Sequence, residues 1–281
     1  MKKKRYLAID GGGTKGIISA IYLSYIEYQT GVPVSKIFDI IAGSSSGGIL
    51  GTLLSVPMEE DLLLPKEDQR PKFTANDALK LYTQNTEKVF GCNVWFKIKN
   101  LWGLIGPRYD SSPLEELFEE NADIKTKNLL TEVITTAYDL ENQTPSSFNS
   151  TDKEDGELRV KDFAMSTSAA PTFFKPYKIP GRGVYVDGAM YAPTPANWLL
   201  MGIERLIASG SKNLPEELAN TTLVSIGTGS VDPSRSTKYK GAQNWGVIQW
   251  LFAAFEIFND GVTDSIDNQS RGLLGNRHFR I

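Results

Sequence analysis

The chain has 281 residues, of which 41% are hydrophobic and 22% are charged, and its formal net charge is −3. That composition is typical of a globular protein with a sizeable core, and a single domain over residues 1–281 is expected. The near balance of charge leaves no electrostatic footprint for nucleic acid, and the chain contains no apolar run long enough to span a membrane.

The N-terminus shows no export signal. The basic stretch Met1 to Arg5 leads into a β-rich segment and glycines, where a signal peptide would have a longer apolar segment. Cys92 is the one cysteine, so no intramolecular disulfide can form and a reducing compartment is expected. These features favour a cytoplasmic protein that contacts membranes only peripherally.

The first predicted element is a strand over residues 6–9, followed by a glycine loop and a helix. The loop contains Gly11, Gly12 and Gly13, and apolar residues recur at helical spacing from residue 17 onward. Consecutive glycines leave backbone N–H groups accessible, and the helix N-terminus adds partial positive charge. The segment therefore predicts a loop that binds a phosphate or a transient oxyanion.

The second predicted unit, over residues 43–48, is a nucleophile elbow. A short apolar run precedes it and an apolar helical pattern follows, so strand, tight turn and helix come in the required order. Gly43 and Gly47 stand where the backbone must turn sharply. Because Gly/Ser runs also form plain turns, it is this context that makes Ser45 the candidate nucleophile. Negative charge formed during acyl transfer could then be stabilised by the glycine loop and the N–H of Ser46.

Mixed α and β patterns follow, without repeats. Residues 112–115 have the spacing of a capping box and predict a helix through Phe118, and residues 131–138 predict a strand. A further strand, residues 183–187, ends in an aspartate. In open α/β sheets ligands collect beyond the carboxyl ends of strands, so this aspartate can meet the elbow there.

The base in such a site is expected to be a carboxylate. Serine hydrolases normally use a histidine, and the one histidine here, His278, lies near the chain end, where a surface or packing position is favoured. Asp187 is the candidate base, with Asp10 and Asp39 as rivals that spacing does not dismiss. An exposed aspartate is a weak base at neutral pH, so burial in an apolar pocket is required. Nearby aromatic residues are candidate walls or plain core: Phe173, Phe174, Tyr191 and Trp198.

These motifs, in this order, resemble those of the patatin-like phospholipase family, lipid acyl hydrolases with a Ser-Asp dyad. The family's G-G-G-x-[K/R]-G loop is matched by residues 11–16, its G-x-S-x-G-G elbow by residues 43–48 and its D-G-[G/A] by residues 187–189. Residues 166–174 and 223–229 are also similar to family segments.

The resemblance implies a three-layer α/β/α sandwich with a mostly parallel central sheet. It implies Ser45 as nucleophile, Asp187 as base and an oxyanion hole from the loop of Gly11 to Gly13. The implied activity is phospholipase A or lysophospholipase chemistry in lipid degradation, through an acyl-serine and without metal or cofactor, on phospholipid or lysophospholipid at a membrane surface. A protein or small-molecule activator is compatible with the sequence.

Two departures from the family pattern stand out. Family members commonly carry asparagine before a proline where this chain has Pro193-Thr194-Pro195, and many continue past a segment that resembles residues 277–281. The natural protein is therefore either compact or longer at its C-terminus.

Two other classes of protein fit parts of the sequence. Residues 9–15 and 227–230 resemble the phosphate loops of ATP-binding sugar kinases of the actin and Hsp70 superfamily, which would leave the elbow unexplained. A non-catalytic lipid-binding protein could keep the same fold. Residues 94–105 and 245–258 mix aromatic residues with basic or amphipathic patterns, which is typical of interfacial membrane contact and also of buried helices.

Overall fold

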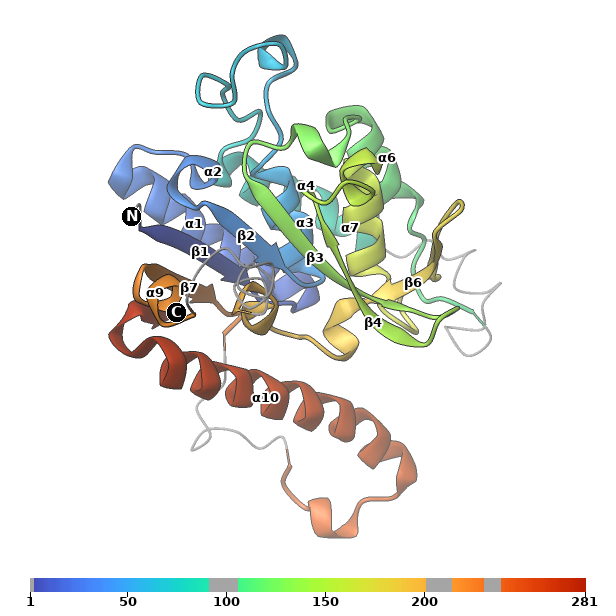
Figure 1. The fold of residues 1–281 in the computed structure, drawn as a ribbon. Coiled ribbons are helices and arrows are strands. Elements are labelled where there is room, and N and C mark those ends of the chain that lie inside the picture. The colour runs from blue at the N-terminus through green and yellow to red at the C-terminus, as the bar shows by residue number, and fades with distance from the viewer. Residues whose placement is uncertain (1–2, 91–105, 201–213, 230–238) are drawn as a thin grey trace.

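The computed structural model of the protein describes residues 3–90, 106–200, 214–229 and 239–281 (Figure 1). Its centre is a mixed sheet in the order β5-β6-β3-β2-β1-β7-β8, with β4 paired to β3. The strands are β1 Lys4–Ile9, β2 Ile40–Gly43, β3 Glu132–Asp139, β4 Thr144–Asn149, β5 Tyr177–Ile179, β6 Gly183–Asp187, β7 Thr221–Ile226 and β8 His278–Arg280. β3, β2, β1, β7 and β8 are mutually parallel, while β4 and β6 run antiparallel to β3.

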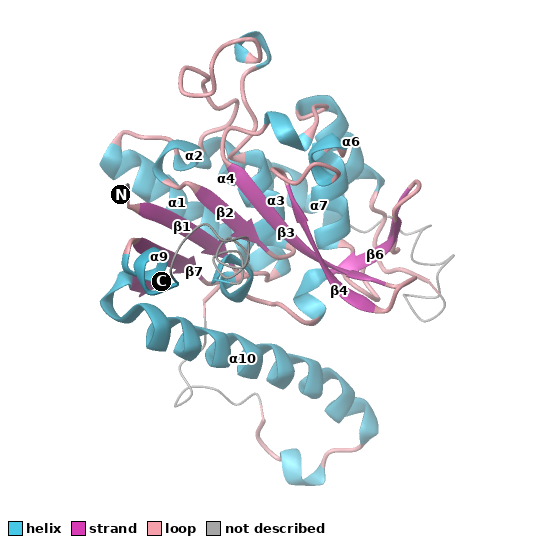
Figure 2. Cartoon of the chain, in the orientation of Figure 1, coloured by secondary structure: helices cyan, strands magenta, loops and turns pink. Residues whose placement is uncertain are grey.

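Helices cover both faces of this sheet (Figure 2). The described helices are α1 Gly16–Thr30, α2 Val34–Ile37, α3 Ser46–Leu53, α4 Ala75–Phe90, α6 Ser112–Asn121, α7 Val160–Ser168, α9 Leu214–Ala219 and α10 Val247–Leu274. Central strands that are buried on both faces have continuous apolar sequences, and the last four residues of β1 are an example. Leu7 and Ile9 pack with α1 and α3, whereas Tyr6 and Ala8 pack on the other face with Ile266 of α10. The expected three-layer α/β/α architecture with a mostly parallel sheet is confirmed.

The strand predicted over residues 131–138 is β3, but the predicted capping box is wrong. Helix α6 begins at Ser112 itself, with Ser111 as N-cap, and the Ser111 side chain makes no capping hydrogen bond. The Ser112 N–H donates to Asp110 Oδ1 at 3.0 Å. The Ser112 hydroxyl also donates to Asp110 Oδ1 at 2.9 Å. The spacing was right for a helix start, but the serine took the first helical position rather than the cap.

The two halves of α10 lie in different surroundings. Its C-terminal half packs on the sheet through Val262, Ile266 and Leu274. Its N-terminal half extends past the sheet (Figure 1), and there Trp250 and Phe258 are exposed. The other segment with a membrane-like pattern, residues 94–105, lies outside the described residues. Across the described ranges, no helix combines the length and apolarity needed to cross a membrane.

Candidate active site

The sheet brings the ends of β2 and β6 together along one edge of β3. β4 pairs with β3 over residues 134–139 and so occupies the opposite edge throughout. On the shared edge, Gly43 of β2 lies opposite Thr135, and Asp187 of β6 lies opposite Ala137, two residues further along. Because β6 is antiparallel to β3, its carboxyl end points back toward the elbow that follows β2. Two segments about 140 residues apart in sequence thereby meet.

The turn after β2 has the geometry of a nucleophile elbow. Ser45 stands between β2 and α3 with φ 51° and ψ −123°, a conformation that L-residues rarely adopt. A Cβ on Gly47 would lie 2.2 Å from the carbonyl oxygen of Ile9, and one on Gly43 would lie 2.3 Å from the carbonyl oxygen of Gly47. Glycine is therefore required at both positions because backbone passes within contact distance. The Ser45 N–H donates to Thr167 Oγ1 at 3.0 Å, which fixes the turn from the α7 side.

The Ser45 hydroxyl donates to Asp187 Oδ2 at 2.6 Å. The other carboxylate oxygen, Oδ1, accepts the N–H of Ala189 at 2.8 Å, so the carboxylate orientation is fixed. A Cβ on Gly188 would lie 2.2 Å from Thr136 Oγ1, and the small residue lets β6 approach β3 closely at this point. Ser45 is 8% exposed and Asp187 is 3% exposed, so the pair is shielded from bulk water.

Burial raises the pKa of Asp187 to about 7, and the hydrogen bonds from Ser45 and Ala189 offset it only in part. A carboxylate with a pKa in that range can take a proton at neutral pH, which an ordinary exposed aspartate does poorly. Asp187 is therefore buried, as a carboxylate base must be.

The rival carboxylates are occupied elsewhere. Asp10 pairs with Arg280, whose Nη2 lies 2.5 Å from Oδ2. Asp39 accepts the backbone N–H of Arg5 at 2.8 Å and precedes β2, at the end of the strand opposite Ser45.

His278 does not take part in the elbow. It lies in β8, and its Nε2 is 3.0 Å from Ser225 Oγ and 3.6 Å from Asp267 Oδ1. Its side chain is only 1% exposed, and burial lowers its pKa. His278 is therefore a packing residue on the edge strand, one of the two positions expected for it.

The glycine loop contacts the elbow directly. A Cβ on Gly11 would lie 3.2 Å from the Cβ of Ser45 and 3.3 Å from that of Ala189. The Gly11 N–H donates to the carbonyl oxygen of Pro193 at 2.9 Å, so this predicted oxyanion donor is already used. Gly12 follows with φ 173°, and Gly13 has φ 57° and opens the short 3-10 turn before α1.

Three contacts at the site were not foreseen from the sequence. Thr167 lies in the Ser/Ala-rich segment before β5, but nothing in the pattern assigns it to the Ser45 N–H. Pro193, in the loop that departs from the family pattern, holds Gly11. Thr136 donates to Ser44 Oγ at 3.0 Å. Among the described residues, no group of three or more His, Cys, Asp or Glu side chains is placed to hold a metal.

A mostly parallel sheet between two helical layers, with a strained serine at a strand–helix turn, defines an α/β protein with the geometry of a serine hydrolase. The sequence profile described as "Patatin-like phospholipase" matches residues 7–200, which include both Ser45 and Asp187. The chain belongs to the patatin-like phospholipase family, a family of lipid acyl hydrolases that act on lipid substrates.

The family likeness extends over nearly the whole chain. Patatin-like protein 2 of Oryza sativa subsp. indica is 28% identical over 95% of this chain and 72% of its own length. Patatin-like protein 1 of Arabidopsis thaliana is 28% identical over 93% of this chain and 66% of its own length. A relative from Solanum tuberosum, 26% identical over 89% of this chain and 69% of its own length, is named "Probable inactive patatin-3-Kuras 1". Family membership alone does not therefore establish catalysis.

Among solved structures, VipD from Legionella pneumophila aligns with 92% of this chain and 55% of its own, at a TM-score of 0.39 and 14% identity.

Proposed function

We propose that the protein hydrolyses fatty acyl esters of phospholipids or lysophospholipids through an acyl-Ser45 intermediate. The observation that carries this proposal is the 2.6 Å hydrogen bond between Ser45 Oγ and a buried Asp187. The raised pKa of Asp187, about 7, supports it, because a base must have appreciable proton affinity at the working pH.

In the first half-reaction Ser45 Oγ attacks the acyl carbonyl carbon while its proton passes to Asp187 Oδ2. The tetrahedral intermediate collapses, the bond to the leaving alcohol breaks, and Asp187 returns the proton to that alcohol oxygen. In the second half-reaction Asp187 takes a proton from water, whose oxygen attacks the acyl-Ser45 carbonyl. The fatty acid leaves when Asp187 protonates Ser45 Oγ. The enzyme ends as it began, and no metal or cofactor is consumed.

The oxyanion of both tetrahedral intermediates needs hydrogen-bond donors beside Ser45. We assign that role to the N–H groups of Gly12, Gly13 and Ser46, with Gly11 as the support of the loop because its own N–H is bonded to Pro193. Donors of this kind typically contribute about 3–4 kcal/mol each to the transition state. Ser46 opens α3, so the helix dipole adds to the field there.

A sugar-kinase-like function is not favoured. In those proteins the first glycine loop turns into an antiparallel strand, whereas here α1 begins at Gly16 directly after the loop. The kinase interpretation also gives no role to the hydrogen bond between Ser45 and Asp187.

The N-terminal half of α10 is our candidate for the surface that meets the lipid phase. Trp250, Phe255 and Phe258 are 43%, 44% and 49% exposed on it. Trp245 lies edge-on to Trp250, with ring centroids 5.6 Å apart, and extends the aromatic surface. Exposed tryptophan and phenylalanine on one helix favour insertion at the boundary between head groups and acyl chains.

Intact-mass labelling with a long-chain fluorophosphonate tests the proposal. The wild type should gain one adduct, and Ser45→Ala should gain none. Ser44→Ala is the matched control, because Ser44 is the adjacent buried serine and should leave labelling intact. Lipid esters of defined head group and sn-position then identify the substrate. An adduct that persists in Ser45→Ala would refute the proposal, and folded wild type that binds vesicles without labelling would favour a non-catalytic lipid-binding protein.

A further inference from the structure

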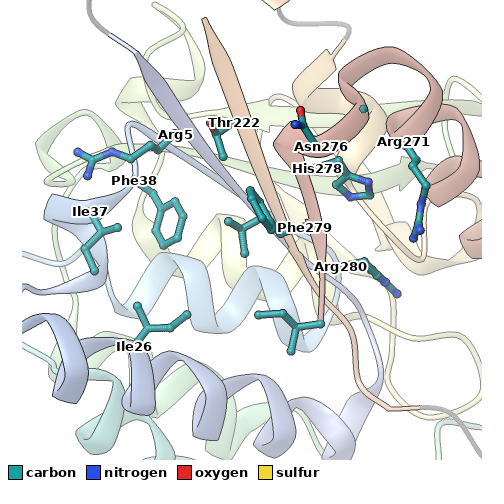
Figure 3. Close-up of a pocket in the computed structure, with 13 residues that line it drawn as sticks. Arg5, Ile26, Ile37, Phe38, Thr222, Arg271, Asn276, His278, Phe279 and Arg280 are labelled. Carbon is teal, nitrogen blue, oxygen red and sulfur yellow. The ribbon is translucent and has the colours of Figure 1, made fainter.

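The end of the chain touches the glycine loop through one buried ion pair. Asp10 directly precedes the loop and is 4% exposed, and its Oδ2 accepts from Arg280 Nη2 at 2.5 Å. Arg280 belongs to β8, 270 residues away in sequence. Figure 3 shows Arg280 and His278 on one side of β8 and Phe279 on the other. The guanidinium is thus directed to the side of the strand where α10 packs.

β8 also holds the end of β7 against the same loop. The Ile281 N–H donates to Ser225 O at 2.9 Å, and the Gly227 N–H donates to Ile281 O at 2.8 Å. A Cβ on Gly227 would lie 3.0 Å from Arg280 Nη2, so the guanidinium lies directly on this backbone. The next residue, Thr228, donates its hydroxyl to Gly11 O at 3.3 Å.

Gly12 lies against the same threonine. A Cβ on Gly12 would approach Thr228 to 2.6 Å, so the loop and the end of β7 are in close contact. On its other side the loop is held by the bond from Gly11 to Pro193. The loop is therefore clamped between the β7–β8 edge and the segment that follows Asp187, and Arg280 is the charged part of the first clamp.

We infer that Arg280 is a positioning residue: through Asp10 it fixes the glycine loop at the distance from Ser45 that oxyanion binding requires. The guanidinium of Arg280 contacts Asp10 and lies against Gly227. Its effect would be on the intermediate rather than on substrate binding, because the loop donors are needed only once negative charge has developed. The catalytic part of this inference rests on the proposed function, and the part about loop geometry does not.

The kinetic test compares Arg280→Met with wild type on a soluble acyl ester. We expect kcat to fall by about 10- to 100-fold with KM nearly unchanged, because small displacements of positioned groups have effects of that size. Arg280→Lys should retain more activity, and added guanidinium should partly restore Arg280→Met. Arg271→Met is the matched control: Arg271 is a second arginine beside β8, its side chain is 64% exposed, and it pairs with Asp267.

Amide hydrogen exchange tests the loop without using activity. In Arg280→Met, peptides over residues 6–16 should exchange faster than in wild type, while peptides over residues 40–53 should not change. If Arg280→Met does not fold, Arg280→Lys is measured in its place. Wild-type exchange and wild-type kcat would overturn the inference, as would faster exchange spread evenly over the sheet, which would mean a general structural role. A wild type without esterase activity would sink the proposed function and leave the exchange result to decide the loop contact.

Discussion

The ends of β1 and β6 each present a buried aspartate beside the elbow, and the two differ in what faces the carboxylate. Asp10 is paired with Arg280, whereas the Asp187 carboxylate accepts from the Ser45 hydroxyl and the Ala189 N–H and has no cation beside it among the described residues. Burial raises the pKa of both, but at Asp10 the guanidinium opposes that rise. The ion pair with Arg280 gives Asp10 a structural role. Asp187 has no such cation and keeps the proton affinity that a base needs.

The roles assigned to the two aspartates would be wrong if Asp10 rather than Asp187 served as the base. We expect Asp187→Asn to lower kcat for acyl ester hydrolysis by about 10³- to 10⁴-fold, since an amide cannot accept the serine proton. Asp10→Asn should lose far less, because it only weakens the support of the glycine loop. Steady-state kinetics on both folded variants decides, and equal losses would remove the distinction.

The raised pKa of Asp187 should also make the stability of the protein depend on pH. The folded-state pKa of Asp187 is raised from 3.8 to about 7, so its contribution is present at low pH and is lost as pH rises through 7. Asp187→Asn removes that loss and should be more stable than wild type at pH 8, by up to about 4 kcal/mol.

Two controls accompany this measurement by urea unfolding. The gain in Asp187→Asn should shrink to less than about half of its pH 8 value at pH 5, where wild-type Asp187 is protonated in the folded state. Asp10→Asn should change stability at pH 8 by less than Asp187→Asn does, because removal of a buried carboxylate with a raised pKa is offset by the loss of the ion-pair partner of Arg280. A destabilised Asp187→Asn at pH 8 would contradict the assignment.

The pH dependence of activity sharpens the same contrast. Only the deprotonated carboxylate of Asp187 can act as base, so kcat/KM should rise with pH around a midpoint near 7. Between pH 7 and pH 5 the value should fall by about 50-fold. Asp10→Asn should keep the wild-type midpoint, and a midpoint that moves in this variant would point to Asp10 as the titrating group.

The smallest expected effect concerns the backbone of the nucleophile. Thr167→Val removes the acceptor of the Ser45 N–H and should lower kcat by about tenfold, because the turn loses one of its supports. Thr167→Ser should restore most of the loss. Thr135→Val is the control, since the buried hydroxyl of Thr135 has no hydrogen-bond partner among the described residues. Equal effects of the two valine substitutions would assign the loss to packing alone.

Much of the fold and of the site geometry could be predicted from local pattern. The strand–loop–helix units around the glycine loop and the elbow depend on glycine and on apolar spacing within about 20 residues, and these are visible in the sequence. The sequence rule places ligands beyond the carboxyl ends of parallel strands, and it led to the expected meeting of Ser45 with Asp187. In the structure the two residues meet for a different reason, because β6 runs antiparallel to β3 and its carboxyl end points toward that of β2. The roles of these two residues stay predictions until they are tested.

The contacts that support the site could not be predicted in the same way. Arg280 reaches Asp10 and Thr167 reaches Ser45 across more than 100 residues, so no local spacing encodes them. The last residues carry no strand signal in the sequence, yet they form β8, because their pairing with β7 depends on where α10 returns the chain. The hydrogen bond from the Gly11 N–H to the carbonyl oxygen of Pro193 was also not predictable, because Pro193 lies in the loop that departs from the family pattern.

The backbone of Ser45 has a consequence for how this protein can change over generations. Its φ of 51° and ψ of −123° suit glycine better than serine, and holding a side chain there costs about 1–3 kcal/mol. Replacement of Ser45 by glycine would relieve that strain while it abolishes the proposed chemistry. Selection for folding alone therefore favours loss of the nucleophile. A descendant that no longer needs catalysis would be more stable and would have no hydrolase activity.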